Sequence, residues 1–324
     1  MLASAATQSS HKLEGLNALR GVAVLLVLFF HFAPGAVPTI FTAFTGVLGI
    51  VLFFFLSGFF MDRTLAQDKN VLAFAIKRVG RIVPLYWGSL IAAFIIGNWT
   101  PRDVVANALF LIPFTKTELM SGVYWTLYIE IAFYVVVPVI ALLGRRAIAV
   151  SLYMAIALNV AVAAMKGHPS HTLYYMMFCL AGMQFGLWHR GLISTFYLAA
   201  AVVAATGHAI VLSDQPVSMG LACVISSAAL WVGLIHQNSG RNVLSTFGDI
   251  SYSLYLLHAV IGLPVTKFLV EVGMGVWFSA LAGVAVSIAT SLATYRWIER
   301  PCNGAAHIAE SKSKQATLNF KGDH

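Results

Sequence analysis

The stretch that decides the fold is residues 13–31, LEGLNALRGVAVLLVLFFH, in which ten uncharged residues separate Arg20 from His31. At about 100° and 1.5 Å per residue, a helix places these two side chains within about 20° of the same face and about 16 Å apart along its axis. Ionisable groups cost free energy to bury in a membrane helix and therefore mark candidate functional sites. The stretch predicts a membrane helix with Arg20 at the membrane's edge and His31 past its middle.

The composition of the whole chain indicates the same class of protein. Hydrophobic residues make up 59% of the 324 residues, charged residues make up 10%, and the mean hydropathy is +0.83. Soluble domains carry about 25% charged residues. We therefore predict an all-α polytopic membrane protein with about ten transmembrane helices, and a shorter apolar stretch at 104–114 that is re-entrant or interfacial. The predicted spans are 15–35, 43–62, 82–98, 124–143, 147–165, 171–188, 193–212, 217–236, 250–270 and 275–297.

Membrane topology accounts for the net charge of +8. If the N-terminus is cytoplasmic, 16 of the 20 lysines and arginines fall on the cytoplasmic side, and the other four are Arg102, Lys116, Lys166 and Lys267. The positive-inside rule requires this distribution, so we expect both termini in the cytoplasm and no nucleic-acid partner. The expected organisation is a cytoplasmic tail at 1–12, a transmembrane domain at 13–301 and a disordered cytoplasmic tail at 302–324.

Familiar nucleophile and metal motifs do not occur in this sequence. The three cysteines, Cys179, Cys223 and Cys302, predict neither a disulfide framework nor a metal site. No phosphate-binding P-loop, G-x-S-x-G elbow or H-E-x-x-H pair is present. His31 is therefore the leading candidate for a reactive group.

Two polar clusters each have a structural and a functional interpretation. Ser57-Gly58 in the second span could serve close helix packing alone or could belong to a site. Lys77, Arg78 and Arg81, in the loop before the third span, could anchor the chain at the membrane surface. Alternatively they could bind phosphates, because arginine forms bidentate contacts with phosphate oxygens.

Glu130 is the acidic residue that this topology places inside the membrane, about 8 Å below Trp125. His31 lies about 5 Å below the outer end of the first span, so we expect both groups in the outer layer. A carboxylate beside an imidazole fixes its tautomer and raises its basicity. We therefore expect Glu130 to orient His31. The alternative is that Glu130 is neutral or hydrogen-bonded elsewhere.

Aromatic residues form two further groups. Tyr252, Tyr255 and His258 follow one side of the ninth span and could line a polar cavity or hydrogen-bond within the core. Tyr124, Trp125 and Tyr128 lie near the outer end of the fourth span, where they are also typical of an interfacial belt.

Six sequence blocks in a fixed order run from residue 13 to 301. Together the chain resembles the membrane-bound acyltransferase 3 family, whose members O-acylate bacterial surface and exported glycans and, in some cases, antibiotics. Each block alone is weak, whereas six in order are specific, and they favour the functional interpretation of Arg20, His31 and the Arg78/Arg81 pair. The blocks are Leu-Arg20-Gly21 with ten residues before His31, Phe-Leu-Ser57-Gly58-Phe59, Arg78-Val-Gly-Arg81-Ile-Val-Pro84, Trp125-Thr-Leu-Tyr-Ile-Glu130-Ile-Ala-Phe-Tyr134, Ile250-Ser-Tyr-Ser-Leu-Tyr-Leu-Leu-His258 and Glu299-Arg-Pro301.

The resemblance implies an enzyme of the bacterial inner membrane that uses acyl-CoA from the cytoplasmic side and acylates a sugar on the outer side. It implies essential roles for Arg20 and His31. Acyl-CoA is a donor substrate, with acetyl as the default group, and no permanently bound cofactor or metal is expected. The expected partners are the bilayer, a free or lipid-linked carbohydrate, and proteins of polysaccharide synthesis.

A mechanism follows as a hypothesis. The CoA phosphates bind Arg78 and Arg81, with Lys77 as a third cation, and Arg20 holds a phosphate or the pantetheine end. The pantetheine passes Ser57-Gly58 towards His31, which acts as general base or as a transient acyl-imidazole, with Glu130 orienting it. The predicted acceptor-binding residues are Tyr124, Trp125, Tyr128, Tyr252, Tyr255 and His258.

Two other functions stay open at this point. A secondary transporter would also bury arginine, histidine and glutamate at different depths, usually with broken helices and inverted repeats. An enzyme of the same family could instead acylate a small molecule such as a macrolide at the cytoplasmic face. Many relatives carry a soluble esterase-like domain after the membrane part, and only about twenty residues follow Pro301 here. We therefore expect the complete transfer within the membrane domain, unless a separate partner finishes it.

Overall fold

The computed structural model describes residues 13–35, 37–67, 71–236, 240–302 and 304, and every regular element in these ranges is helical. The predicted all-α class is confirmed, while the predicted N-terminal tail and most of the predicted C-terminal tail lie outside the described residues. The helices are α1 (Glu14–Phe32), α2 (Thr39–Gln67), α3 (Val71–Ile96), α4 (Pro101–Ala108), the short 3₁₀ helix η1 (Ile112–Phe114), α5 (Tyr124–Leu142), α6 (Arg145–Lys166), α7 (His171–His189), α8 (Thr195–Val211), α9 (Pro216–Ile235), α10 (Val243–Asp249), α11 (Ser251–Leu257), the π-helix η2 (His258–Gly262), α12 (Leu263–Glu271), α13 (Val276–Thr294) and the π-helix η3 (Tyr295–Glu299).

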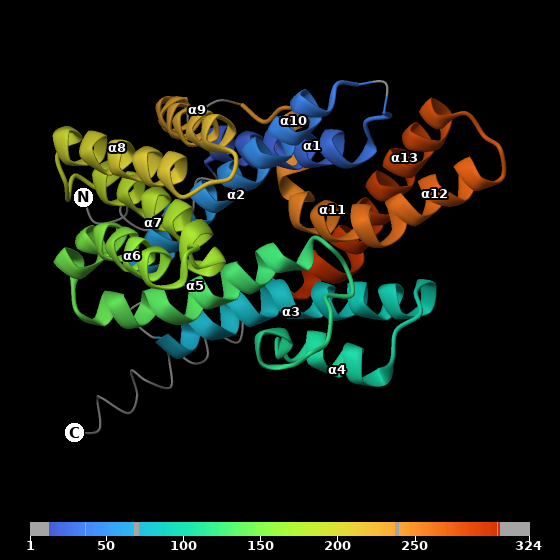
Figure 1. The fold of residues 1–324 in the computed structure, drawn as a ribbon, viewed down its shortest axis with the longest axis horizontal. Helices are drawn as coiled ribbons and strands as arrows, with labels where there is room; N and C mark the ends of the chain where they lie inside the picture. The colour runs from blue at the N-terminus through green and yellow to red at the C-terminus, as the bar shows by residue number, and fades with distance from the viewer. Residues whose placement is uncertain (1–12, 36, 68–70, 237–239, 303, 305–324) are drawn as a thin grey trace, which may run out of the picture.

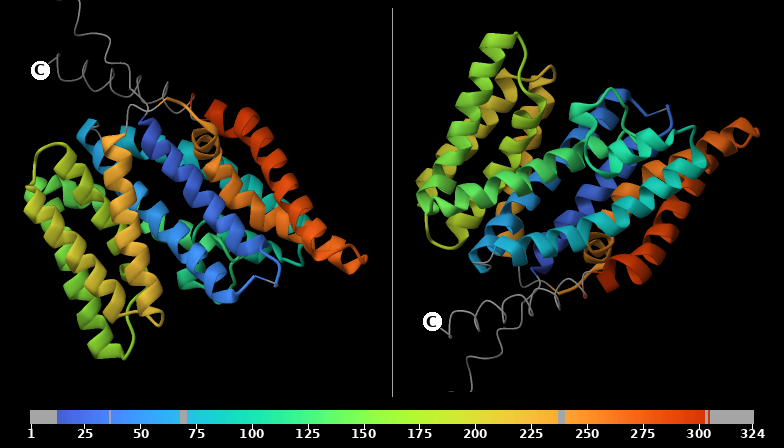
Figure 2. Two further views of the ribbon diagram at one scale, coloured as in Figure 1. Left: turned by 90° about the horizontal axis from the view of Figure 1, so that it is seen from above. Right: turned by 90° about the horizontal axis from the view of Figure 1, so that it is seen from below.

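The helices form two lateral groups around a central set (Figure 1). Helices α6 to α9 gather on one side and α11 to α13 on the other, with α1, α2, α3 and α5 between them. Contacts of α2 with α7 join the first group to the centre, and contacts of α1 with α11 and α13 join the second. The views from above and below show the long helices running side by side (Figure 2).

Eight of the described helices are long and apolar enough to cross a membrane. They correspond to eight of the ten predicted spans; the other two are α7 and α8. Helix α8 is apolar but has 17 residues. Helix α7 has 19 residues, of which 13 are buried by neighbouring helices. A helix enclosed by protein meets little lipid, so α7 needs no apolar outer face.

Glycines set the distance between α2 and α7. A Cβ on Gly58 would collide with the backbone carbonyl of Cys179, and one on Gly182 would collide with the backbone of Phe55. Small residues allow membrane helices to approach closely in this way. Gly58 therefore has a packing role, and it is not among the residues that line the cavity described below. Ser57, about 100° further round the helix, lines that cavity.

We expect Gly58→Ala to lower the melting temperature of the detergent-solubilised protein by several degrees. The added methyl group forces two backbones apart, and overpacking of this kind costs about 1–3 kcal/mol. Gly88→Ala in α3 is the matched control, because nothing lies within 4 Å of the position that its Cβ would take and alanine is the better helix former. Identical melting temperatures for the two variants would contradict the packing role.

The half of α1 that carries Arg20 is held by α10, a short helix outside the predicted spans. A Cβ on Gly21 or on Gly248 would meet the backbone of the opposite helix. The Asn17 amide donates a hydrogen bond of 2.9 Å to the Asp249 carboxylate. These contacts fix the beginning of α1 and with it the direction of the Arg20 side chain.

Helix α3 begins eleven residues before the predicted span 82–98. Arg78 and Arg81 therefore lie within a helix, whereas we had expected them in the loop before it. The helix continues through these charges because Arg78 has partners inside the bundle, the Tyr134 hydroxyl at 3.3 Å and the Thr64 hydroxyl at 3.0 Å.

The connection between α3 and α5 determines the depth of α5. It folds back along α3: the Tyr86 hydroxyl donates to the Asn107 carbonyl at 3.1 Å, and the Tyr124 hydroxyl lies 2.9 Å from that of Ser89. Ser89 precedes the end of α3 by seven residues, or about 10 Å. Helix α5 therefore begins about 10 Å inside the far end of α3, and Glu130 lies about 9 Å further along.

The predicted span 250–270 is interrupted by a π-turn. Helix α11 ends at Leu257, the π-helix begins at His258, and α12 continues from Leu263. Such turns are rare and occur frequently at functional sites. The interruption places His258 at the junction between the two helices.

Candidate active site

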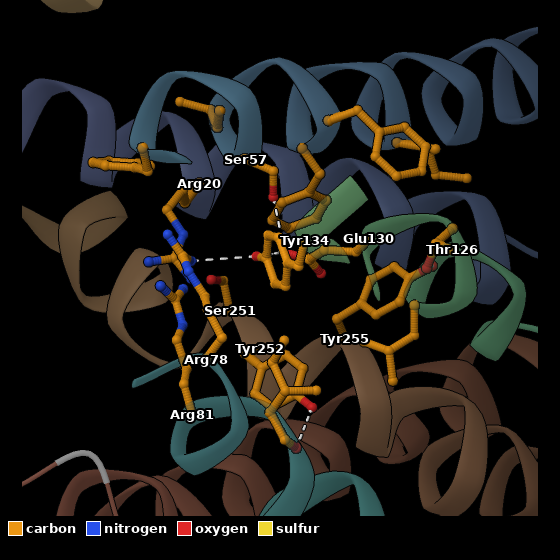
Figure 3. Close-up of a pocket in the computed structure, with 17 residues that line it drawn as sticks. Arg20, Ser57, Arg78, Arg81, Thr126, Glu130, Tyr134, Ser251, Tyr252 and Tyr255 are labelled. Carbon is orange, nitrogen blue, oxygen red and sulfur yellow. Dashed lines mark hydrogen bonds between the residues drawn. The ribbon is translucent and has the colours of Figure 1, made fainter. Parts of the chain in front are cut away.

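A cavity lies between α1, α2, α3, α5 and α11, and the space between the helices of a bundle is a common place for a ligand site. It contains seven of the site residues predicted from the sequence: Arg20, Ser57, Arg78, Arg81, Glu130, Tyr252 and Tyr255. Figure 3 shows these side chains pointing into one space from five different helices. Segments far apart in the chain therefore form a single polar site.

Three arginines converge at one end of this cavity (Figure 3). Arg78 is 8% exposed, and its guanidinium carbon lies 4.7 Å from the centre of the Tyr134 ring. Among the described residues, neither Arg20 nor Arg81 makes a hydrogen bond or ion pair with another side chain. The carboxylates of Glu299 and Glu130 attract the Arg20 guanidinium electrostatically. Two guanidinium groups are thus available to an anion.

Glu130 lies beside the arginines and is held by two hydroxyl groups. Ser57 donates to its carboxylate at 2.9 Å, and Tyr134 donates to the same oxygen. Because Arg78 in turn donates to the Tyr134 hydroxyl, a continuous chain of hydrogen bonds joins α3, α5 and α2. The cavity lining carries three cations and one carboxylate, so its field is positive.

The prediction that Glu130 orients His31 is wrong. The hydrogen bonds of Glu130 run to Ser57 and Tyr134, and His31 does not line the cavity. The physical reason is depth. The fold-back of the connection before α5 displaces Glu130 from the layer of His31 to the layer of Arg78.

Aromatic rings connect the other end of the cavity to His31. The Tyr255 hydroxyl, 2.8 Å from that of Thr126, closes this end. The Tyr255 ring lies 5.8 Å from the ring of His258, which lies 5.0 Å from the ring of His31. His258 is fully buried, whereas His31 is partly exposed. His31 therefore lies beyond the cavity end opposite the arginines.

The predicted acceptor residues do not form one group. Tyr124 is fully buried against Ser89 and the Tyr86 ring, so it belongs to the core and not to an outer mouth. The Tyr128 ring packs against Phe110. Trp125 lies outside the cavity. The centre of its ring is 5.0 Å from the centre of the His171 ring and 4.7 Å from that of Tyr175. Lys77, on α3, is not among the residues that line the cavity.

Sequence reasoning assigned no role to three polar residues of the cavity, Thr126, Tyr134 and Ser251. Tyr134 had a detectable signal, because it lies four residues after Glu130 and so shares its helical face. The contact between Thr126 and Tyr255 joins residues 129 apart in the chain, and no local pattern indicates such a pair.

The sequence of this chain matches a known family over the same helices. The family model described as an acyltransferase domain matches residues 13–296. The chain belongs to the membrane-bound acyltransferase 3 family. The match includes every residue that lines the cavity, so the arginine cluster and the carboxylate network lie within the family's own domain.

This acyltransferase is similar to proteins of two Rhizobium species. It is 27% identical to the exopolysaccharide production protein ExoZ of Rhizobium meliloti (strain 1021), over 86% of this chain and 94% of the relative. It is 24% identical to nodulation protein 10 of Rhizobium leguminosarum bv. viciae, over 78% and 81% of the two chains. No solved structure gives a significant match. The chain is a multi-pass membrane protein with O-acyltransferase activity.

Proposed function

We propose that this enzyme takes an acyl group from acyl-CoA at the cytoplasmic face of the bacterial inner membrane and transfers it to a hydroxyl group of an exported or cell-surface carbohydrate. The proposal rests on one observation. Three arginines converge at one end of a cavity whose other end lies one aromatic ring away from the His258–His31 pair. An arginine cluster suited to phosphates and a candidate base thus lie at opposite ends of one line of contacting side chains in the bundle.

The arginine end suits the phosphates of acyl-CoA. A guanidinium group binds phosphate oxygens through two parallel hydrogen bonds, and Arg20 and Arg81 have this capacity available. The excess positive charge of the lining attracts anions more strongly inside the bundle than in water. Basic residues concentrate at the same end of the helices, which supports a cytoplasmic location. We take acetyl-CoA as the donor.

The name of one relative supports a carbohydrate acceptor, since it is an exopolysaccharide production protein. The position of His31 supports an acceptor from the opposite side of the membrane, because it lies about 16 Å from Arg20 along α1. A lipid-linked or free glycan, supplied by proteins of polysaccharide synthesis, fits this geometry.

His31 supplies the base for the transfer. In the direct route it takes the proton of the acceptor hydroxyl as that oxygen bonds to the thioester carbonyl carbon. The carbon–sulfur bond then breaks, and the proton passes to the departing sulfur. In the two-step route the His31 ring bonds to the thioester carbonyl carbon, the carbon–sulfur bond breaks, and the ring proton passes to the departing sulfur. The acceptor oxygen then bonds to the acyl carbon, the carbon–nitrogen bond breaks, and the hydroxyl proton returns to the ring. Both routes yield one ester and one CoA thiol.

The acceptor class can be tested with purified protein in lipid nanodiscs, labelled acetyl-CoA, and either a bacterial polysaccharide fraction or a macrolide. We expect label in the polysaccharide as a base-labile ester, with one CoA thiol released per ester. Label in the macrolide alone would overturn the carbohydrate acceptor. No thiol release with either acceptor would overturn acyl-CoA as the donor and favour a transporter.

A further inference from the structure

His258 has a ring nitrogen that is buried without a partner. The residue is 0% exposed, and its Nδ1 lies 3.1 Å from the Leu254 carbonyl. A carbonyl accepts only, so Nδ1 carries the hydrogen and Nε2 carries a lone pair. Nε2 has no hydrogen-bond partner. Leaving a buried acceptor unpaired is costly, which indicates that Nε2 serves a group able to reach it.

His31 is the ring next to His258 that can supply the missing hydrogen. Of the three rings packed around His258, Phe32 has no polar atom, and the Tyr255 hydroxyl is already paired with Thr126. The centroid of the His31 ring lies 5.0 Å away, with the two planes at 47°. Because each ring nitrogen lies about 1 Å from its centroid, facing nitrogens can approach to about 3 Å, within hydrogen-bond range. The structure itself has no hydrogen bond between the two rings, so the pairing requires the His31 ring to turn about its terminal torsion, which is soft.

The backbone around His258 is built to hold it against α1. The π-helix begins at His258 and ends at Gly262. A Cβ on Gly262 would meet the Phe32 ring of α1 and the Ser287 hydroxyl of α13. This close approach fixes the π-turn beside the last turn of α1, where His31 lies. The Phe32 ring of α1 therefore packs directly on the π-turn that begins at His258.

We propose that His258 is the positioning residue for His31, in the place that the sequence had assigned to Glu130. Its Nε2 accepts a hydrogen bond from one ring nitrogen of His31, which leaves the other ring nitrogen with its lone pair directed at the acceptor hydroxyl. When His31 takes that proton, the same bond stabilises the imidazolium, as an orienting group does in a catalytic triad. The inference rests on the proposed function, because it assigns His31 the role of base.

Two variants separate positioning from packing. His258→Asn places an amide N–H near the position of Nδ1 and so keeps the hydrogen bond to the Leu254 carbonyl. It has no acceptor at the position of Nε2. His258→Gln reaches the Nε2 position with a carbonyl oxygen and so restores the acceptor. Both variants are purified in nanodiscs, and the kcat and the KM for labelled acetyl-CoA are measured with the polysaccharide fraction as acceptor.

We expect the kcat of His258→Asn to fall about tenfold or more with an unchanged KM, and we expect His258→Gln to retain most of the wild-type kcat. The rate at which diethyl pyrocarbonate modifies His31, followed by mass spectrometry, should fall severalfold in the Asn variant and little in the Gln variant. That rate needs no turnover. If the wild-type protein transferred no acyl group, the proposed function would be wrong. The modification rates would still test whether His258 positions His31. Equal kcat losses in both variants, or equal modification rates, would overturn the inference.

Discussion

Replacing His31 by alanine is expected to lower kcat by about 100- to 10,000-fold, the contribution of a positioned general base. His31 is partly exposed at the end of α1, and its ring packs against His258 beyond the cavity end opposite the arginines. Apart from the proposed hydrogen bond to His258, its side chain bonds to no described residue, so its removal should leave the fold intact. The measurement is the release of CoA thiol from acetyl-CoA in the presence of the polysaccharide fraction.

The matched control for this variant is His168→Ala. His168 is an exposed histidine in the loop before α7, and its replacement should leave kcat unchanged. If both variants had comparable melting temperatures, the loss of activity in His31→Ala would not be caused by a loss of folding. A His31→Ala protein that transfers acetyl groups at the wild-type rate would remove His31 from the chemistry.

The double variant Arg78→Ala/Arg81→Ala is expected to raise the KM for acetyl-CoA by about 100-fold or more. Each hydrogen bond to a charged group contributes about 1.5–3 kcal/mol, and two arginines are lost. The KM for the acceptor should change little, because the acceptor binds at the His31 end. Initial rates with either substrate varied separately would provide both constants.

A second pair of arginines provides the control for nonspecific loss of charge. Arg145 and Arg146 lie exposed at the beginning of α6, on the side expected to be cytoplasmic. Arg145→Ala/Arg146→Ala removes the same formal charge, so it should leave the KM for acetyl-CoA near its wild-type value. If both double variants raised the KM equally, a general surface potential would explain donor binding better than the cavity does.

Much of the fold follows from the sequence because lipid imposes simple rules. Backbone groups must be satisfied within each membrane segment, and long apolar stretches are therefore helices. The exceptions are elements that meet protein and not lipid. Helix α7 is enclosed by its neighbours, and α3 continues through Arg78 because that side chain is paired inside the bundle. Neither condition can be read from local hydropathy.

The candidate site likewise has a part that could be predicted from the sequence and a part that depends on contacts between distant segments. Arg20, Arg78 and Arg81 could be singled out because the family resemblance favoured a functional interpretation over membrane anchoring, and the structure places them in one cavity. Glu130 was placed in the wrong layer because its depth depends on contacts of the preceding connection with α3, such as Tyr124 with Ser89. The pairing of His31 with His258 joins helices more than two hundred residues apart, so no local sequence pattern predicts it.

The most direct test of transfer between the two ends of the cavity uses sealed proteoliposomes of known protein orientation. Labelled acetyl-CoA is supplied on the arginine side alone, and the polysaccharide fraction is enclosed on the His31 side alone. We predict labelled ester in the enclosed polysaccharide, abolished by His31→Ala and reduced by Arg78→Ala/Arg81→Ala at low donor concentration. Ester formation only when donor and acceptor share the arginine side would contradict transfer across the membrane through this path.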